Sequence, residues 1–260
     1  MRFTQYGGSA FIGVFAMILT GCASVKTHDP RDPWEGFNRN VQTFNDKVDS
    51  YVMKPVAKGY RWVMPNFADQ GVTNFFSNLD DISVTTNDLL QGKFKQSGMD
   101  GGRFLVNSSV GVAGLVDVAS MIDLPKHNED FDQTMGVWGI PSGPYVVLPF
   151  FGPSSPRGVV GLVGDAAMNP VTYTGFYLNP GWVGSAISTG LGAVKAVDSR
   201  ADLLSAEKVA EEAALDRYDF YKNAYFSRRE YLIKDGNVPE EDVLKFDQEQ
   251  DKGYGPINPY

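Results

Sequence analysis

Two histidines and one cysteine are the side chains whose types most often serve metal binding or nucleophilic catalysis. His28 lies in a polar N-terminal stretch, and His127 lies in the segment Lys126-His127-Asn128-Glu129-Asp130-Phe131-Asp132. A histidine beside carboxylates can hold a metal ion, but a short segment of mixed charge is more commonly a solvated loop. The single cysteine, Cys22, permits neither an internal disulfide nor a zinc site built from cysteines. We therefore expect no metal site and no bound cofactor.

Asp117 is a second candidate for chemistry because it is the only charged residue in the apolar stretch 110–122. A buried carboxyl with a raised pKa can act as a general acid or base. A carboxylate in apolar surroundings is, however, more commonly satisfied by hydrogen bonds to the backbone. The sequence contains no Gly-x-Ser-x-Gly motif, no G-x-G-x-x-G motif and no P-loop. We expect a protein that has no catalytic residue and is not an enzyme.

The composition of the chain excludes several classes of protein. Its 260 residues can bury a full core, and with 13% aromatic residues the chain is too apolar to be disordered throughout. The formal net charge of −8 argues against nucleic acid as a partner, since binding to phosphates requires basic patches. The 28 glycines exceed the usual share of about 7% and need a structural reason.

The N-terminal residues have the pattern of an export signal. Arg2 is the only charge in residues 1–21, and the uncharged run Ala10–Leu19 is shorter than the ~20 residues that span a bilayer. The run ends in Leu19-Thr20-Gly21-Cys22, where small residues precede the only cysteine, as in bacterial lipoprotein signals. We predict a signal peptide over 1–21 and lipidation of Cys22. A secretory signal with a chance cysteine is the alternative.

Acylation at Cys22 would tie the chain to a membrane. Each buried CH₂ group contributes ~0.8 kcal/mol, so two or more acyl chains anchor a protein stably where one does not. The next residue is Ala23 rather than aspartate, which in lipoproteins of this kind directs sorting to the outer membrane. We expect residues 22–31 to form a polar tether and the protein to be anchored at the periplasmic face of the outer membrane.

Hydrophobic spacing predicts one mainly α-helical domain over residues 32–236. Apolar residues recur at steps of three and four after Asp32-Pro33 and predict a helix to about Ser50, which Lys54-Pro55 interrupts. Strand signals are few, and no internal repeat is present. The tail 237–260 is acidic and expected to be disordered. Further helices are expected over 56–63, 67–90, 94–109, 157–168, 181–197 and 206–234.

Two segments are almost free of charge. Residues 110–122 predict a helix that is apolar nearly all round and must be buried in protein or lipid. Segment 181–197 carries small residues at four-residue spacing, which lets helices pack closely in apolar surroundings. A packed helix of a soluble core gives the same pattern, so both interpretations remain open. The small residues are Gly184, Ser188, Gly192 and Ala196.

The centre of the chain, residues 123–155, is rich in proline and glycine and excludes a long helix. Within it, Tyr145–Phe151 is strongly apolar, unlike an ordinary exposed loop. Such a loop packs in a core or contacts an apolar partner, and its glycines and prolines can set hinges and rigid turns. We predict that it borders or gates a path for lipid. The candidate residues are Pro141, Gly143, Pro144, Tyr145, Pro149, Phe150, Phe151 and Gly152.

Several motifs resemble those of one family. Residues 32–39, which include Phe37, Asn38 and Arg39, look like the opening motif of the MlaA (VacJ) outer-membrane lipoproteins. Asn107 followed by Gly111-x-x-Gly114-x-x-Asp117 matches the central motif of that family. Residues 131–154 and 224–229 match two further motifs, and the resemblance covers about 30–236.

Two positions depart from the family pattern. Arg157-Gly158 stands where the family often has Arg-Asp, and Pro141 stands where glycine is common. We expect both differences to change local loop geometry without removing the function.

The resemblance implies a fold and a role. Members of the family form a single ring-like bundle of amphipathic helices embedded in the periplasmic leaflet of the outer membrane, and they associate with trimeric porins. A polar-lined passage through the ring takes phospholipids mislocalised in the outer leaflet. These pass to a soluble periplasmic carrier, MlaC, for retrograde transport that maintains outer-membrane lipid asymmetry. We expect the same of this chain.

Two other functions remain as alternatives. A structural lipoprotein that only braces porins would need the same anchor and apolar faces but would transfer no lipid. A lipid-modifying enzyme such as a phospholipase would act on similar molecules. The sequence has no recognisable pairing of a nucleophile with a histidine, and lipidation would occupy the only thiol.

Overall fold

The computed structural model describes residues 29–173, 182–205, 207 and 216–237. The expected signal peptide, the expected lipidation site Cys22, most of the expected tether and nearly all of the acidic tail lie outside these residues. The described part is mainly helical, as predicted. The helices are α2 (Glu35–Val48), the π-helical η1 (Asp49–Met53), α3 (Lys54–Val63), α4 (Asn66–Gln91), α5 (Phe94–Ser109), α6 (Val118–Met121), α7 (Phe131–Val137), α8 (Pro156–Met168), α10 (Trp182–Asp202) and α12 (Arg217–Ile233); the strands are β1 (Val146–Leu148) and β2 (Gly152–Ser154).

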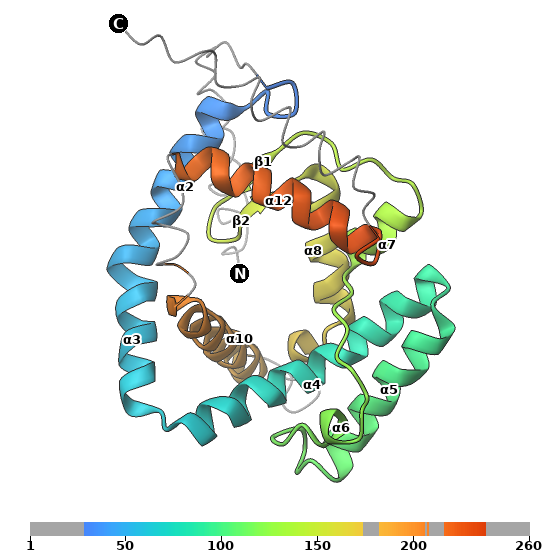
Figure 1. The fold of residues 1–260 in the computed structure, drawn as a ribbon. Coiled ribbons are helices and arrows are strands. Elements are labelled where there is room, and N and C mark those ends of the chain that lie inside the picture. Colours follow the sequence, from blue (N-terminus) through green and yellow to red (C-terminus); the bar gives the residue numbers. More distant parts are fainter. Residues whose placement is uncertain (1–28, 174–181, 206, 208–215, 238–260) are drawn as a thin grey trace, which may run out of the picture.

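The helices follow one another around the edge of the molecule in Figure 1. There α2 and α3 form one side, α4 crosses the bottom, α7 and α8 lie on the opposite side, and α12 crosses the top. The contacts agree with this order, since α2 contacts β1, β2 contacts α12, α12 contacts α7, and α7 contacts α4. Helix α10 packs against α3 and α4, whereas α5 and α6 form a lobe beside α4.

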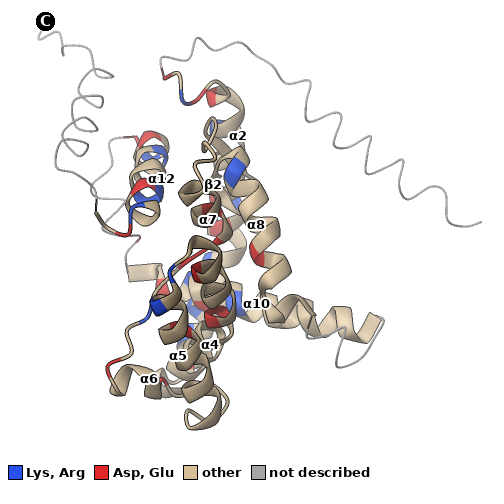
Figure 2. Ribbon diagram, turned by 90° about the vertical axis from the view of Figure 1, so that its right-hand side faces the viewer, with Lys and Arg blue, Asp and Glu red and all other residues tan. Residues whose placement is uncertain are grey.

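The molecule has two sides that differ in charge (Figure 2). Helix α12 stands on one side and carries acidic and basic residues along its length. Helix α10 projects from the other side, and its outer part, residues 182–194, has no charged residue. Charged residues of both signs therefore lie along α12, whereas the outer end of α10 has none.

The expected break at Lys54-Pro55 is a change of helix type instead. The chain passes from α2 through η1 into α3, and Lys54 keeps helical dihedral angles of φ −63° and ψ −45°. Because proline lacks an N–H group, it is tolerated in the first turn of a helix, and Pro55 lies at the start of α3. Just before Pro55, the Lys54 N–H donates to the Asp49 carbonyl oxygen, which is the hydrogen-bond spacing of a π-helix.

Residues 110–122 do not form the single buried helix that we predicted. Val112, Ala113 and Gly114 have φ angles of 54°, 57° and 89°, which a right-handed helix does not allow. A Cβ atom added at Gly111 would lie 2.2 Å from the Val116 carbonyl oxygen, so glycine is required where the loop folds back. Only the four-residue α6 follows. The apolar side chains are not buried within the protein, so of the two predicted surroundings only lipid is left; the exposed residues are Val110, Val112, Leu115, Val116, Met121 and Ile122.

The proline-rich centre contains no long helix, as predicted, but it holds a short helix and a hairpin that the sequence did not indicate. Asp130 caps α7 by accepting a hydrogen bond from the Gln133 amide at 2.7 Å. Strands β1 and β2 pair antiparallel with Leu148 opposite Gly152, which leaves residues 149–151 as the turn. The hairpin lies beside α2 and α12.

The distribution of polarity is the reverse of that in an ordinary soluble domain. Among the described residues, twenty buried residues are polar or charged and ten are hydrophobic, whereas 34 large hydrophobic residues are exposed. Exposed apolar surface of this extent marks contact with lipid or with another protein. Helix α4 shows the pattern within one element: its buried polar residues include Asn78, Asp81, Asn87 and Asp88, and its exposed apolar residues include Phe67, Leu89 and Leu90.

Candidate functional site

The base of the hairpin is fixed to α2 by Asn38. Its Nδ2 donates to the Tyr145 carbonyl oxygen at 3.1 Å, and its Oδ1 accepts from the Val147 N–H at 2.9 Å. The same Nδ2 also donates to the Asp32 carboxylate at 2.8 Å. Because all of these residues are buried, the amide replaces hydrogen bonds that water or a neighbouring strand would otherwise supply.

The tip of the hairpin is held by Asn45, two helical turns further along α2. Its Nδ2 donates to the Leu148 carbonyl oxygen at 2.9 Å, and its Oδ1 accepts from the Phe150 N–H at 2.8 Å. The Phe44 ring meets the Phe150 ring edge to face, with centroids 5.3 Å apart. Phe150 and Phe151 are nevertheless 72% and 73% exposed, so the tip presents two aromatic rings outward.

Tyr145, which we predicted to border the lipid path, belongs to the protein core instead. It has no exposed surface and packs with Val147 and Tyr218. Alternate residues of a strand face opposite sides, so the residues at 145 and 147 turn inward together. Of the other candidates, Pro141, Gly143, Pro149, Phe150 and Phe151 are exposed, and Pro144 and Gly152 are half-buried.

Arg39 joins α2 to the start of α12. Its guanidinium group lies 2.7 Å from the Glu35 carboxylate and 3.0 Å from the Asp216 carboxylate, and it stacks over the Tyr218 ring. Although burial opposes its charge, these hydrogen bonds raise the pKa of Arg39 above its usual value. Phe37, from the same motif, points to the surface. The opening motif thus fastens α2 to the rest of the protein.

Asp117 caps α6 and forms an ion pair with Arg103. Its carboxylate accepts from the Ser120 amide at 3.2 Å, from Asn107 Nδ2 at 2.9 Å, and from Arg103 at 3.1 Å. Burial opposes its ionisation, but these hydrogen bonds lower the pKa of Asp117 to about 2. The predicted raised pKa is therefore wrong, and the predicted hydrogen bonding to the backbone is confirmed for one bond, while the other donors are side chains.

The carboxyl groups of Asp88 and Asp100 form a pair that lies buried between α4 and α5. Burial and the adjacent Asp100 raise the pKa of Asp88 to about 8. His127, which is half-buried, lies at the edge of this pair, with its Nδ1 2.9 Å from Asp100 Oδ2. Within the described ranges, no group of three His, Cys, Asp or Glu residues is arranged to bind a metal ion.

Two glycines of α8 make close contacts with α7. A Cβ atom added at Gly161 would lie 2.7 Å from Asp132 Cβ, and one added at Gly164 would lie 2.4 Å from the Phe131 ring. At Gly192 an added Cβ would meet no atom of the described residues within 4 Å. Close packing at Gly192 is therefore not observed. Of the remaining small residues of α10, Gly184 is buried, Ser188 is half-buried and Ala196 is exposed.

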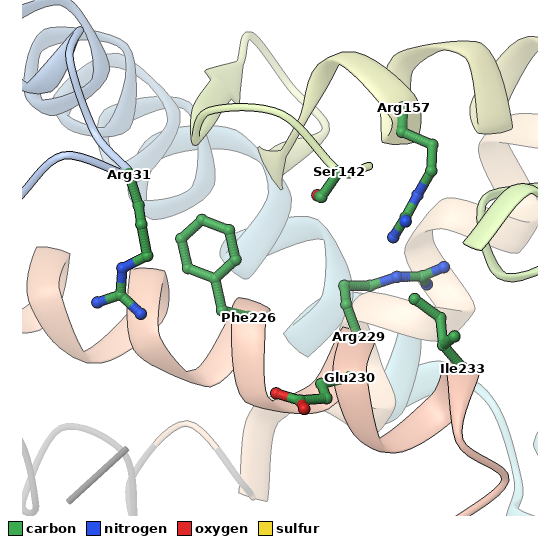
Figure 3. Close-up of a pocket in the computed structure, with 7 residues that line it drawn as sticks. All are labelled: Arg31, Ser142, Arg157, Phe226, Arg229, Glu230 and Ile233. Atoms are coloured by element: carbon green, nitrogen blue, oxygen red, sulfur yellow. The ribbon is translucent and has the colours of Figure 1, made fainter. Parts of the chain in front are cut away.

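A pocket of about 250 Å³ lies between α12 and the segment that leads into α8 (Figure 3). Arg157 and Arg229 approach it from opposite walls. Arg157 binds the Asp132 carboxylate at 2.5 Å, and Arg229 binds the Asp130 carboxylate at 2.7 Å, so both cations are neutralised within the protein. The lining residues are Arg31, Ser142, Arg157, Phe226, Arg229, Glu230 and Ile233.

Four polar residues of these clusters were not predicted from the sequence: Asn45, Asp88, Asp100 and Arg103. A signal existed for Asn45, because it follows Asn38 by seven residues and so shares its helix face. The other three are charged residues on helices whose apolar sides face outward, and periodicity does not show which side of such a helix is buried.

None of the described helices combines the length and the apolar character needed to cross a membrane.

The chain is similar to known proteins over most of its length. The family model described as MlaA lipoprotein matches residues 30–232. The intermembrane phospholipid transport system lipoprotein MlaA of Escherichia coli (strain K12) is 34% identical over 231 residues, which cover 86% of this chain and 88% of that protein. The protein of the same name from Haemophilus influenzae is 32% identical over 245 residues, which cover 88% of this chain and 94% of that protein.

A solved structure also matches. It comes from work on the structural basis for maintenance of bacterial outer membrane lipid asymmetry, and it is 32% identical with a TM-score of 0.66. The match covers 78% of this chain and 98% of that chain. The sequence match and the shared fold therefore agree, and the chain belongs to the MlaA lipoprotein family.

Proposed function

We propose that the protein removes phospholipids mislocalised in the outer leaflet of the outer membrane through an amphipathic passage between its helices. It delivers them to a soluble periplasmic carrier for retrograde transport, which maintains lipid asymmetry. The observation that carries the proposal is the inverted burial pattern, with polar residues inside and large apolar residues outside. Such a protein is stabilised when lipid covers its outer surface, while its interior stays suited to a polar headgroup.

The contrast between the charged α12 side and the uncharged end of α10 supports a particular placement in the membrane. The charged α12 faces the periplasm, and the uncharged outer part of α10 points into the bilayer (Figure 2). Trp182, at the projecting end of α10, is 83% exposed and supplies apolar surface for the acyl region. The acyl chains on Cys22 add an anchor, and the ring-like bundle then lies in the periplasmic leaflet.

A passage for lipid must protect acyl chains from water and keep the headgroup hydrated. Transfer of an acyl chain into water costs roughly 0.8 kcal/mol for each CH₂ group. Summed over both chains of a phospholipid, this cost is far larger than the thermal energy, so the lipid does not cross water unprotected. The exposed tip of the hairpin, Phe150 and Phe151, offers contact for the chains. The polar residues along the inner side of α4 offer contact for the headgroup.

Trimeric porins and an MlaC-like periplasmic carrier are the proposed protein partners. The name of the Escherichia coli relative assigns that protein to an intermembrane phospholipid transport system, and a transport system has further components. The apolar loop 110–117 and the outward sides of α4 and α5 supply surface that a porin could cover in place of lipid. Nucleic acid and cofactors have no part in the proposal.

The test is lipid transfer by the full-length lipidated protein in vesicles. Phospholipid labelled in its headgroup should move to a purified periplasmic carrier, and it should be recovered chemically unchanged. Cells without the protein should accumulate phospholipid in the outer leaflet and become sensitive to detergent. Binding to porins without any transfer would favour the bracing lipoprotein, and cleaved or acylated products would favour the enzyme.

A further inference from the structure

We infer that Asn38 and Asn45 are positioning residues whose side-chain amides set the place of the hairpin tip relative to α2. Together they act as a substitute for a neighbouring β-strand along residues 145–150. The tip, residues 149–151, forms the lip of the passage. The inference deepens the proposed function and rests on it.

The spacing of the two asparagines matches the spacing of the backbone groups that they bind. Seven residues of an α-helix advance about 10.5 Å and return to the same face. Asn38 binds residues 145 and 147, and Asn45 binds residues 148 and 150, so the two bound sites are three residues apart. Three residues of a strand advance about 10 Å. The helix and the hairpin are therefore matched in length, and each amide meets one carbonyl and one N–H group.

The hairpin tip also has a strained conformation that only these contacts enforce. Phe150 has a φ angle of 69°, which is rare for a bulky residue and persists only where the surroundings determine it. Its N–H donates to Asn45, and its ring rests against Phe44. Glycine would adopt this φ angle without strain but would present no ring. Both contacts come from α2, so α2 holds the exposed Phe150 ring in a position that the hairpin backbone by itself would not favour.

The two asparagines differ in how strongly the fold depends on them. Asn38 is fully buried and also binds Asp32, so its replacement would disturb the core. Asn45 is half-buried, and its two bonds reach only the tip. Replacement of Asn45 therefore separates the position of the lip from the stability of the domain.

The experiment uses the full-length lipidated protein with spin labels on two introduced cysteines, Lys47→Cys on α2 and Phe151→Cys at the tip. Both positions are exposed, and acylation of Cys22 leaves the introduced thiols as the only free ones. The distance distribution between the labels reports the hairpin position. Asn45→Ala is compared with Asn40→Ala, an exposed asparagine on the same helix. Lipid transfer and the thermal midpoint are measured on the same proteins without labels.

We expect Asn45→Ala to broaden the distance distribution and Asn40→Ala to leave it narrow. Loss of two hydrogen bonds and release of the strained backbone shift the ratio of docked to undocked tip by roughly a hundredfold. Lipid transfer should fall with the docked fraction, while the thermal midpoint stays close to that of the native protein. A narrow distribution in Asn45→Ala, or a broad one with unchanged transfer, overturns the inference.

Asn45→Asp supplies a readout that a purely structural role would not move. An ionised aspartate accepts from the Phe150 N–H but cannot donate to the Leu148 carbonyl, whereas a protonated one does both. The distribution of Asn45→Asp should therefore be broad at neutral pH and narrow below about pH 4. A distribution that does not change with pH overturns the inference. Absence of lipid transfer by the native protein would instead overturn the proposed function, which separates the two failures.

Discussion

The carboxyl groups of Asp88 and Asp100 meet between α4 and α5, where neither residue has exposed surface. Neither oxygen of Asp88 has another hydrogen-bond donor among the described residues. The two groups can bond to each other only if one of them carries a proton. Glu129 adds negative charge nearby, and Lys93 offsets part of it. The packing of α4 on α5 therefore depends on a retained proton.

Asp88→Asn should remove part of the loss of stability that the protein suffers as the pH rises. The pKa of Asp88 is about 8 in the folded protein against 3.8 for the free group, so the folded state holds a proton that the unfolded state has lost. The stabilising effect of this proton is complete below pH 4 and disappears as the pH rises to about 8. Asparagine mimics the protonated acid at every pH. The thermal midpoint should fall between pH 5 and pH 9 in the native protein and fall less in Asp88→Asn.

The control for this prediction is Asp123→Asn, which removes one negative charge from an exposed position of the same region. Its midpoint should follow the native pH dependence. Parallel curves for Asp88→Asn and the native protein would mean that no proton is retained between α4 and α5.

Asp117→Ala should destabilise the protein by about 2–3 kcal/mol, because it leaves the buried Arg103 without its shortest ion pair. The other carboxylate that pairs with Arg103, Asp81, lies 3.7 Å away, and the uncharged Ser120 hydroxyl and Leu124 carbonyl do not replace the lost charge. The pKa of Asp117 is lowered, so its contribution is present above the unfolded value near 3.8 and is lost as the pH falls towards 2. Urea denaturation at pH 7 measures the change.

The matched control is Asp202→Ala, which breaks the exposed ion pair of Asp202 with Arg61. An exposed pair contributes less than about 1 kcal/mol. Equal losses in the two variants would show that the Arg103 cluster contributes no more than a surface pair.

The sequence predicted the positions of the helices better than their orientation. The expected helices 67–90 and 94–109 agree with α4 and α5 to within a residue at each end, because both have clear apolar periodicity and Gly92 separates them. Periodicity shows two faces of a helix but not which face is inside. In α4 the polar face is the buried one, and only tertiary structure reveals that. The hairpin was missed because its strands have only three residues each.

Glycine spacing predicted close packing correctly in one helix and not elsewhere. Gly161 and Gly164, three residues apart on α8, are closely packed against α7. Gly111 and Gly114 stand three residues apart, as in closely packed helices, but they allow a loop to fold back on itself. Gly184 and Gly192 have the spacing of a packing stripe, yet Gly192 faces open space within the described structure. The spacing of small residues shows which of them share a helix face, but it does not show whether another helix packs against that face.

Gly161→Ala should destabilise the contact of α8 with α7 by about 1–3 kcal/mol, the usual cost of overpacking. The added Cβ would lie 2.7 Å from Asp132 Cβ and 2.9 Å from the Asp132 amide nitrogen, and the backbone cannot move aside cheaply. Gly192→Ala is the control, because it adds the same atom to a helix where no described atom lies within 4 Å. It should stabilise the protein by up to about 1 kcal/mol through helix propensity. Thermal unfolding that orders the two variants the other way would contradict this account of the glycines.

Trp182 should lie within the acyl region of the membrane, and a tryptophan placed on α12 should not. The proposed orientation directs the uncharged end of α10 into the bilayer and the charged α12 towards the periplasm. We would compare two single-tryptophan proteins in vesicles that contain phospholipids with brominated acyl chains. One keeps Trp182, and the other carries Tyr231→Trp on α12, where the native side chain is also exposed. The remaining tryptophans are replaced by phenylalanine; they are Trp34, Trp62, Trp138 and, in the second protein, Trp182.

Bromine quenches tryptophan fluorescence only at short range, so the two proteins report depth independently of each other. We expect strong quenching of Trp182 and little quenching at position 231. Burial of apolar surface of α10 in the acyl region is favourable by about 25 cal/mol for each Å² removed from water. Burial of α12 there would be unfavourable, because its charged residues would lose their hydration. Equal quenching at both positions would mean that the molecule lies with α12 and α10 at the same depth. Quenching at position 231 alone would mean that the proposed orientation is inverted, with α12 in the acyl region and the outer end of α10 outside it.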